Sequence, residues 1–225
     1  MEKQVLAESQ SVVKPPVKKF VFAFEEGDGK NKKLLGGKGA NLCEMTQIGL
    51  NVPPGFVIST EACRLYLEDP ERKLPPGLME EVRSHIALLE EKTGKGFGSP
   101  ENPLLVSVRS GSPVSMPGMM DTILNLGLNP QTLQGLICQT GNERFAYDAW
   151  RRFIQLFGKI ALGVPEERFD EAFEEVKREV GVKLDIGLNA EHMRRISERF
   201  LEIVREETGR PFPEDVFEQL EIAIR

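Results

Sequence analysis

Two cationic side chains in this sequence stand beside turns made of small residues. Arg109 follows an apolar run, residues 104–108, and leads into a loop of serines, prolines and glycines at residues 110–118. Lys38 lies in the sequence GGKGANL, which predicts a glycine turn followed by the start of a helix. Guanidinium and ammonium groups next to exposed backbone N–H groups bind anions. Together the two segments predict a site for a polyphosphate.

Each cation also has a purely structural interpretation. Lys38 could be a solvated lysine in a flexible turn, because the N-terminus of a helix favours anions unless a bound phosphate supplies the negative charge. The segment is not a Walker A loop, since Gly39 follows Lys38 where that motif has Ser or Thr. Arg109 could form a structural ion pair, because a guanidinium at the end of an apolar strand is costly to leave without an anion.

The loop after Arg109 is too apolar to be an ordinary solvated turn. Residues 115–122 read SMPGMMDT. Gly118 would allow a close backbone approach to a ligand, whereas methionines more often fill a core. Asp121 and Thr122 either orient this loop or cap the next helix, and capping is the commoner role of such residues.

The motifs GGKGANL, SVRSG and SMPGMMDTILNLG together resemble the nucleotide-binding end of the pyruvate, phosphate dikinase family, from about residue 19 to residue 225. The second and third motifs are the more specific, because related dikinases share the glycine–lysine turn and phosphoenolpyruvate synthases differ after the arginine. The resemblance implies an ATP-dependent phosphotransferase. Such enzymes convert ATP, pyruvate and phosphate to AMP, phosphoenolpyruvate and pyrophosphate through a phosphohistidine on another domain.

The resemblance also implies roles for individual residues. It assigns Arg109 a catalytic contact with the ATP phosphates, beside Lys38, and makes the following loop a lid over them. The implied nucleotide-binding residues are Lys38, Arg109, Ser115, Gly118, Met119, Asp121 and Thr122. Mg²⁺ is an implied cofactor of the complete enzyme, with acidic ligands beyond residue 225, so no metal ligand is expected in this chain.

Neither histidine of the chain is expected to take part in the chemistry. His85 and His192 lie in helical stretches without a second ligand at metal-binding spacing. Neither matches the motif of the family's carrier histidine. Both are therefore interpreted as partly exposed helix residues.

The spacing of apolar residues predicts an α+β half followed by a helical half. Strands are expected at residues 19–24, 56–58 and 104–108, and helices after Lys38, from Ser59 or Thr60, and around Val82. Further helices are expected at residues 143–160, 165–180, 190–207 and 213–224. With the resemblance, this becomes an ATP-grasp N-terminal subdomain at 18–128 and a helical insert or subdomain at 129–225, after a flexible extension at 1–17.

Composition narrows the class of protein. Hydrophobic residues make up 40% and charged residues 28%, as in globular proteins, and the formal net charge of −6 argues against a nucleic-acid surface. No apolar run approaches the ~20 residues of a membrane span. Three scattered cysteines are typical of reduced intracellular thiols. We expect a cytoplasmic protein; an organelle stays open, although residues 1–17 contain no arginine.

The chain ends at Arg225 inside a helical pattern, and the resembling enzymes are several times longer, so we expect a truncated chain that is inactive alone. Its expected partners are ATP, the phosphohistidine domain and pyruvate-binding barrel of the same enzyme, and a second copy in a homodimer. Two alternatives stay open. One is the nucleotide-binding module of another dikinase, of the phosphoenolpyruvate synthase or glucan dikinase type. The other is a stand-alone module without catalysis.

Overall fold

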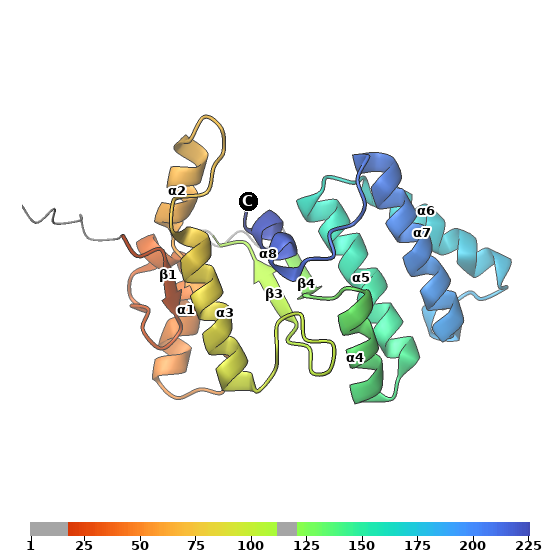
Figure 1. Ribbon diagram of the computed structural model, residues 1–225, viewed down its shortest axis with the longest axis horizontal. Helices are drawn as coiled ribbons and strands as arrows, with labels where there is room; N and C mark the ends of the chain where they lie inside the picture. The colour runs from red at the N-terminus through yellow and green to blue at the C-terminus, as the bar shows by residue number, and fades with distance from the viewer. Residues whose placement is uncertain (1–17, 112–120) are drawn as a thin grey trace, which may run out of the picture.

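The computed structural model describes residues 18–111 and 121–225, and Figure 1 shows their arrangement. The extension at 1–17 and the loop residues Ser115, Gly118 and Met119 lie outside the described residues. Helices and two small antiparallel sheets make up the described part. The α+β class is therefore confirmed, whereas the division at residue 128 stays a prediction.

The first sheet pairs β1 (Val21–Ala23) with β2 (Phe56–Ile58), with Val21 opposite Ile58. Helices α1 (Lys32–Gln47), α2 (Thr60–Glu68) and α3 (Leu78–Thr93) accompany it. Ser59 caps α2 as predicted, because its side chain accepts a hydrogen bond from the Ala62 N–H. Strand β1 is shorter than predicted.

Helix α1 begins before the glycine turn, which corrects the predicted helix start. The side chain of Asn31 caps it by accepting from the Leu34 N–H. At Gly36 the backbone leaves the helical conformation, with φ +69° and ψ 166°, a region that favours glycine. One helical turn therefore precedes the break, and Lys38 lies at the start of the second helical segment.

The second sheet is a hairpin of β3 (Val106–Arg109) and β4 (Thr122–Leu126), in which Arg109 lies opposite Thr122. The predicted helix-capping role of Asp121 and Thr122 is wrong. Thr122 begins a strand, and Asn129 caps the next helix, α4 (Pro130–Thr140), with Pro130 in its first turn. The β3 segment is also not uniformly buried, because Ser107 and Arg109 face solvent.

The remaining helices are α5 (Glu143–Ala161), α6 (Glu166–Glu179), α7 (Ala190–Thr208) and α8 (Val216–Ile224), with a short 3₁₀ turn at Asp185–Gly187. Their positions agree with the predicted helices to within a few residues. Figure 1 shows α8 beside the hairpin and apart from α6 and α7. The pattern of apolar residues does not predict that α8 packs beside the hairpin.

One large core joins the hairpin to the helices. Ile123, Leu126 and Leu128 of the hairpin region belong to the same buried cluster as Phe153 and Phe157 of α5. A smaller cluster, Phe24, Leu35, Ala40 and Cys43, lies under α1. The β3–β4 hairpin and the glycine–lysine turn are thus packed on two separate apolar clusters. Within the described part of the chain, no helix combines the length and the hydropathy that a membrane span needs.

Candidate functional site

Lys38 and Arg109 belong to segments that the fold brings together. The Lys38 ammonium lies 3.5 Å from the backbone carbonyl oxygen of Ser110, although the two residues are 72 positions apart in the sequence. Arg109 directly precedes Ser110 at the end of β3. Both cationic side chains are exposed. A negatively charged ligand can therefore reach both cations from solvent.

Two close approaches fix the backbone around Lys38. The Thr60 hydroxyl donates to the Lys33 carbonyl oxygen at 2.6 Å, in the helical turn before the break at Gly36. After the break, Gly39 lies so close to β2 that a Cβ at this position would be 2.7 Å from Val57 Cγ1. The sequence pattern does not predict these roles of Thr60 and Gly39. Their contacts depend on β2 and α2, which no local pattern places beside α1.

Arg109 has no carboxylate partner among residues 18–111 and 121–225, and neither has Lys38. This contrasts with the many ion pairs elsewhere on the surface. The structural ion pair considered for Arg109 is therefore absent from the described part of the chain. Two cations on adjoining segments, each without an anionic partner among the described residues, are a feature that an anionic ligand would complete.

Asp121 and Thr122 lie at the C-terminal base of the loop that follows Arg109; residues 112–120 of this loop are not among the described residues. The N–H and hydroxyl groups of Ser110 both donate to the Asp121 carbonyl oxygen, at 3.4 and 3.2 Å. Thr122 is the register partner of Arg109. These contacts close the loop at its two ends, beside the cations.

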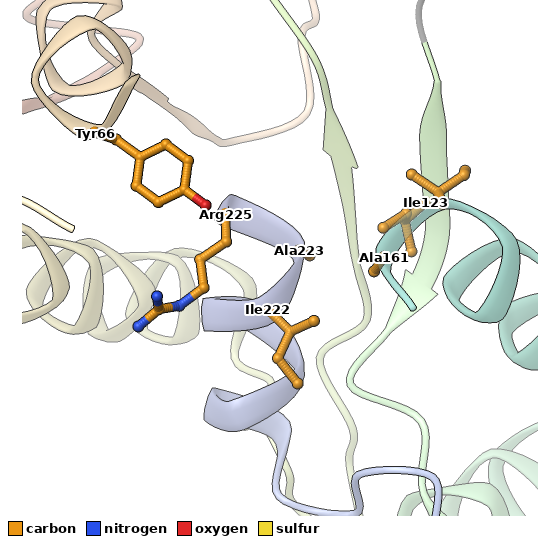
Figure 2. A pocket seen from close by; sticks show the side chains of 7 residues that line it. Tyr66, Ile123, Ala161, Ile222, Ala223 and Arg225 are labelled. Atoms are coloured by element: carbon orange, nitrogen blue, oxygen red, sulfur yellow. The ribbon is translucent and has the colours of Figure 1, made fainter. Parts of the chain in front are cut away.

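A separate cavity of about 460 Å³ lies between α2, β4, the end of α5 and α8 (Figure 2). Its lining is mostly apolar: Tyr66, Ile123, Ile160, Ala161, Ile222, Ala223 and Arg225. The Arg225 guanidinium is engaged by Glu221 at 2.7 Å. Neither Lys38 nor Arg109 lines this cavity, so it is not the anion site.

The described residues offer no metal site: nowhere in them do three or more His, Cys, Asp or Glu side chains gather closely enough to hold an ion. Both histidines have structural contacts. His192 takes part in the cap of α7 with Asn189. His85, in α3, lies between the carbonyl oxygen of Glu81 in the same helix and the carboxylate of Glu26.

The sequence matches known proteins at the region that contains Lys38. Residues 32–74 match the family model described as "Pyruvate phosphate dikinase, AMP/ATP-binding domain". The pyruvate, phosphate dikinase of Entamoeba histolytica is 59% identical over 204 residues, which are 91% of this chain and 23% of that protein.

Two plant relatives are also similar. The chloroplastic pyruvate, phosphate dikinase of Flaveria pringlei is 48% identical over 94% of this chain and 23% of its own length. Pyruvate, phosphate dikinase 1, chloroplastic, of Arabidopsis thaliana is 49% identical over 92% of this chain and 22% of its own length. The chain thus spans about a quarter of the length of the curated relatives it matches.

Proposed function

Because the chain belongs by sequence to the pyruvate, phosphate dikinase family, we propose that it forms part of the ATP-binding domain of such an enzyme. The observation that carries the proposal is the convergence of Lys38 with Arg109 at the end of the β3–β4 hairpin. The relatives named above are all pyruvate, phosphate dikinases, which favours this assignment over a phosphoenolpyruvate synthase or a glucan dikinase.

In the proposed reaction, this chain positions the nucleotide and neutralises its charge. Arg109 would bind the phosphate oxygens with a planar, bidentate guanidinium, and Lys38 would add a point charge from the start of a helical segment. Charge neutralisation of this kind is a major contribution of proteins to phosphoryl transfer. The acceptor would be a histidine on another domain, from which phosphate passes to pyruvate.

The loop between Arg109 and Thr122 would cover the phosphates. Ser115, Gly118 and Met119 are the proposed contacts there, and Asp121 and Thr122 would hold the loop at its base. The described residues do not fit a Mg²⁺ site, so we derive no step through a metal ion. We propose that ATP brings Mg²⁺ to ligands elsewhere in the enzyme.

The finer architectural and cellular assignments are part of the proposal. Residues 18–128, with both small sheets and α1 to α3, would be one subdomain of an ATP-grasp domain, and residues 129–225, with α4 to α8, a helical insert or subdomain. The partners would be the phosphohistidine domain, the pyruvate-binding barrel and a second copy of the enzyme. The relatives include proteins named chloroplastic, so either the cytoplasm or an organelle suits the family.

Anion binding by the chain itself tests the proposal. We expect tripolyphosphate, titrated into the ¹⁵N-labelled chain, to shift the amide resonances of Lys38 and Ser110. Arg109→Ala should weaken binding by about tenfold or more, because hydrogen bonds to charged groups contribute about 1.5–3 kcal/mol. Lys38→Ala should weaken it less, since lysine lacks the bidentate geometry.

Matched controls keep the result specific. Lys33 lies one turn before Lys38, and Arg178 is an exposed arginine of α6; neither has an ion pair among the described residues. Lys33→Ala and Arg178→Ala should bind as the unmodified chain does. Equal losses in all four variants would indicate non-specific attraction and contradict the site. In a complete enzyme, Arg109→Ala should also abolish phosphorylation of the carrier histidine by labelled ATP.

The stand-alone module is distinguished by turnover and affinity. We expect the 225-residue chain, mixed with ATP, Mg²⁺, pyruvate and phosphate, to form no phosphoenolpyruvate, because it spans about a quarter of its relatives. A nucleotide pocket normally buries most of its ligand, so we also expect weak ATP binding. Tight ATP binding without turnover would favour the stand-alone module instead.

A further inference from the structure

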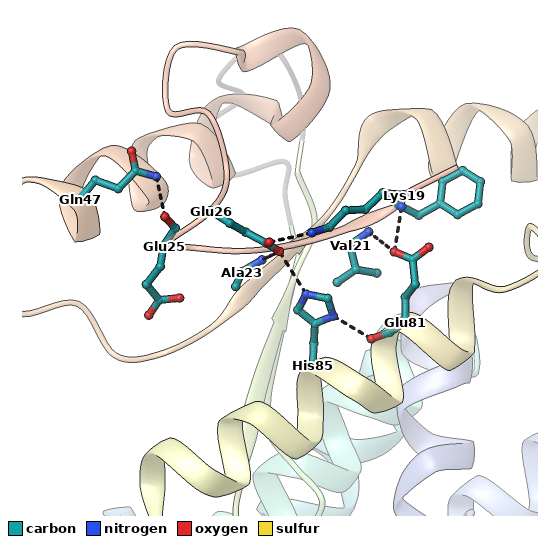
Figure 3. Close-up of polar contacts among 9 residues, drawn as sticks. Lys19, Val21, Ala23, Glu25, Glu26, Gln47, Glu81 and His85 are labelled. Atoms are coloured by element: carbon teal, nitrogen blue, oxygen red, sulfur yellow. Dashed lines mark hydrogen bonds and ion pairs between the residues drawn. The ribbon is translucent and has the colours of Figure 1, made fainter. Parts of the chain in front are cut away.

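One face of α3 carries polar side chains that bind the segment leading into α1 (Figure 3). The Glu81 carboxylate accepts hydrogen bonds from the N–H groups of Phe20 and Val21, at 2.9 and 2.8 Å. Three turns along the helix, the Lys92 ammonium lies 2.7 Å from the Glu25 carboxylate. We call Glu81, His85 and Lys92 the α3 seam.

His85, in the middle of the seam, faces two hydrogen-bond acceptors. Its Nδ1 lies 2.8 Å from the Glu81 carbonyl oxygen, and its Nε2 lies 3.4 Å from Glu26 Oε1. A neutral imidazole carries only one N–H. Both contacts are hydrogen bonds only when His85 is protonated, because neither partner can donate.

The side chain of His85 is largely shielded from water. Its side chain is 12% exposed, and the Phe56 ring of β2 packs on it at 5.4 Å between centroids. Glu26 also accepts from the Lys19 ammonium and the Ala23 N–H. Burial acts to raise the pKa of Glu26, but these hydrogen bonds and that of His85 outweigh it and lower the pKa. Glu26 is therefore ionised at neutral pH.

The segment held by His85 is packed firmly on the helix that carries Lys38. Gln47, near the end of α1, donates to the carbonyl oxygens of Gly27 and Phe24 at 2.6 and 3.2 Å. Gly29 lies so close to Glu44 that a Cβ would meet it at 2.8 Å. The segment and α1 therefore move as one body.

The segment of the other cation is also tied to α3, near the C-terminal end of the helix. Glu90, in the last turn of the helix, accepts the Phe97 N–H at 2.7 Å, and the Leu104 N–H donates to Gly96 just before β3. Helix α3 thus holds the Lys38 body through the seam and the Arg109 hairpin through its C-terminal end. The seam therefore belongs to the helix that contacts the segments of both cations.

We propose that protonation of His85 is a pH switch for the anion site. With imidazolium at the seam, α3 holds Lys38 beside Ser110; after deprotonation the bond to Glu26 is lost, the Lys38 body loosens, and anion binding weakens. The functional consequence rests on the proposed anion site, whereas the coupling between His85 and Lys38 does not.

The coupling is tested by NMR on the 225-residue chain between about pH 5.5 and about pH 8, on either side of the ordinary imidazole pKa of about 6.5. We expect the amide resonances of Gly37, Lys38 and Gly39 to follow the titration of the His85 ring. His85→Gln should abolish this dependence and Glu26→Gln should reduce it. His192→Gln, which changes the other histidine, should retain it. Amides that do not follow His85, or that titrate unchanged in His85→Gln, overturn the switch.

Anion affinity gives the second measurement. The ratio of tripolyphosphate dissociation constants at the two pH values is compared between the unmodified chain and His85→Gln, so that titration of the ligand cancels. We expect the ratio to be about threefold larger with His85 present, the effect of one partly exposed ion pair. Equal ratios overturn the switch. Coupled amides in a chain that binds no anion would support the seam and contradict the proposed function.

Discussion

At the scale of single residues, Gly39 determines how closely α1 approaches β2. An added Cβ would lie 2.7 and 2.9 Å from the two methyl groups of Val57, a stiff β-branched side chain. Gly39→Ala should therefore destabilise the fold by about 1–3 kcal/mol, the usual cost of overpacking, and weaken tripolyphosphate binding by displacing Lys38.

Urea unfolding of Gly39→Ala measures this cost. Gly111→Ala is the control, because within residues 18–111 and 121–225 no atom lies within 4 Å of a Cβ at Gly111. A Gly39→Ala chain as stable as the control would show that α1 has room to move from β2. We would then abandon the view that this glycine positions Lys38.

Residue types predicted the two cations, but only the fold shows their proximity. Lys38 and Arg109 could be identified because a cation beside a small-residue turn is a local pattern. Of the two roles considered for Asp121 and Thr122, helix capping was wrong, although an Asp–Thr pair is typical of helix caps, because Thr122 begins β4. The following residues, TILNL, place Ile123 and Leu126 inward and Leu124 outward, with Asn125 at φ +59°, which blurs the simple alternation of a strand.

At the scale of elements, Gln219 attaches α8 to the hairpin. This fully buried side chain accepts the Gly127 N–H at 3.1 Å and donates to the carbonyl oxygens of Leu128 and Pro213, both at 2.9 Å. Gln219→Met keeps most of the volume but leaves these three groups without partners. We expect a loss of roughly 3 kcal/mol, because each buried unsatisfied group costs about 1–3 kcal/mol.

Thermal and urea unfolding test this prediction against Gln134→Met, which changes an exposed glutamine of α4. The control should unfold as the unmodified chain does. If Gln219→Met were equally stable, water or rearranged backbone would have to satisfy the three groups. The attachment of α8 would then depend on its apolar contacts alone.

The helices themselves were predictable, whereas their docking was not. The 3.6-residue period of apolar side chains marks α5, α6 and α7, and proline or asparagine marks several of their starts. The apolar period of a helix indicates which of its faces is buried, but it does not indicate which other element packs on that face. The return of α8 to the hairpin combines the apolar contacts of Val216 and Leu220 with the hydrogen bonds of Gln219, and a glutamine in a helix is ordinarily solvated.

At the scale of the whole molecule, ion pairs cover the helical surface. Arg168 pairs with Glu206 and Glu207, and Arg199 with Glu202 and Glu206. These side chains are largely exposed, so each pair contributes little to stability. The net charge of −6 adds repulsion between the acidic side chains of the surface. The cationic side chains of Lys38 and Arg109 locally offset this negative charge.

Acid should loosen the molecule first at the segment between β1 and α1. The hydrogen bond from Lys92 lowers the pKa of Glu25, and hydrogen bonds lower that of Glu26 despite its burial. A carboxyl group with a lowered folded-state pKa stabilises the fold above its unfolded-state pKa, about 4.3 for glutamate, and this contribution is lost as pH falls through the folded-state pKa. Because both side chains are partly exposed, we expect the two to contribute no more than about 1 kcal/mol together.

The double variant Glu25→Gln, Glu26→Gln should therefore lose less stability than the unmodified chain when urea unfolding at neutral pH is compared with unfolding at about pH 3, below the ordinary glutamate pKa. Glu101→Gln with Glu175→Gln removes the same charge at exposed positions that have no ion pair among the described residues. That control should keep the acid sensitivity of the unmodified chain. If both double variants resist acid equally, net charge governs the loss. Resistance confined to the first would place it at the segment that α3 holds beside Lys38.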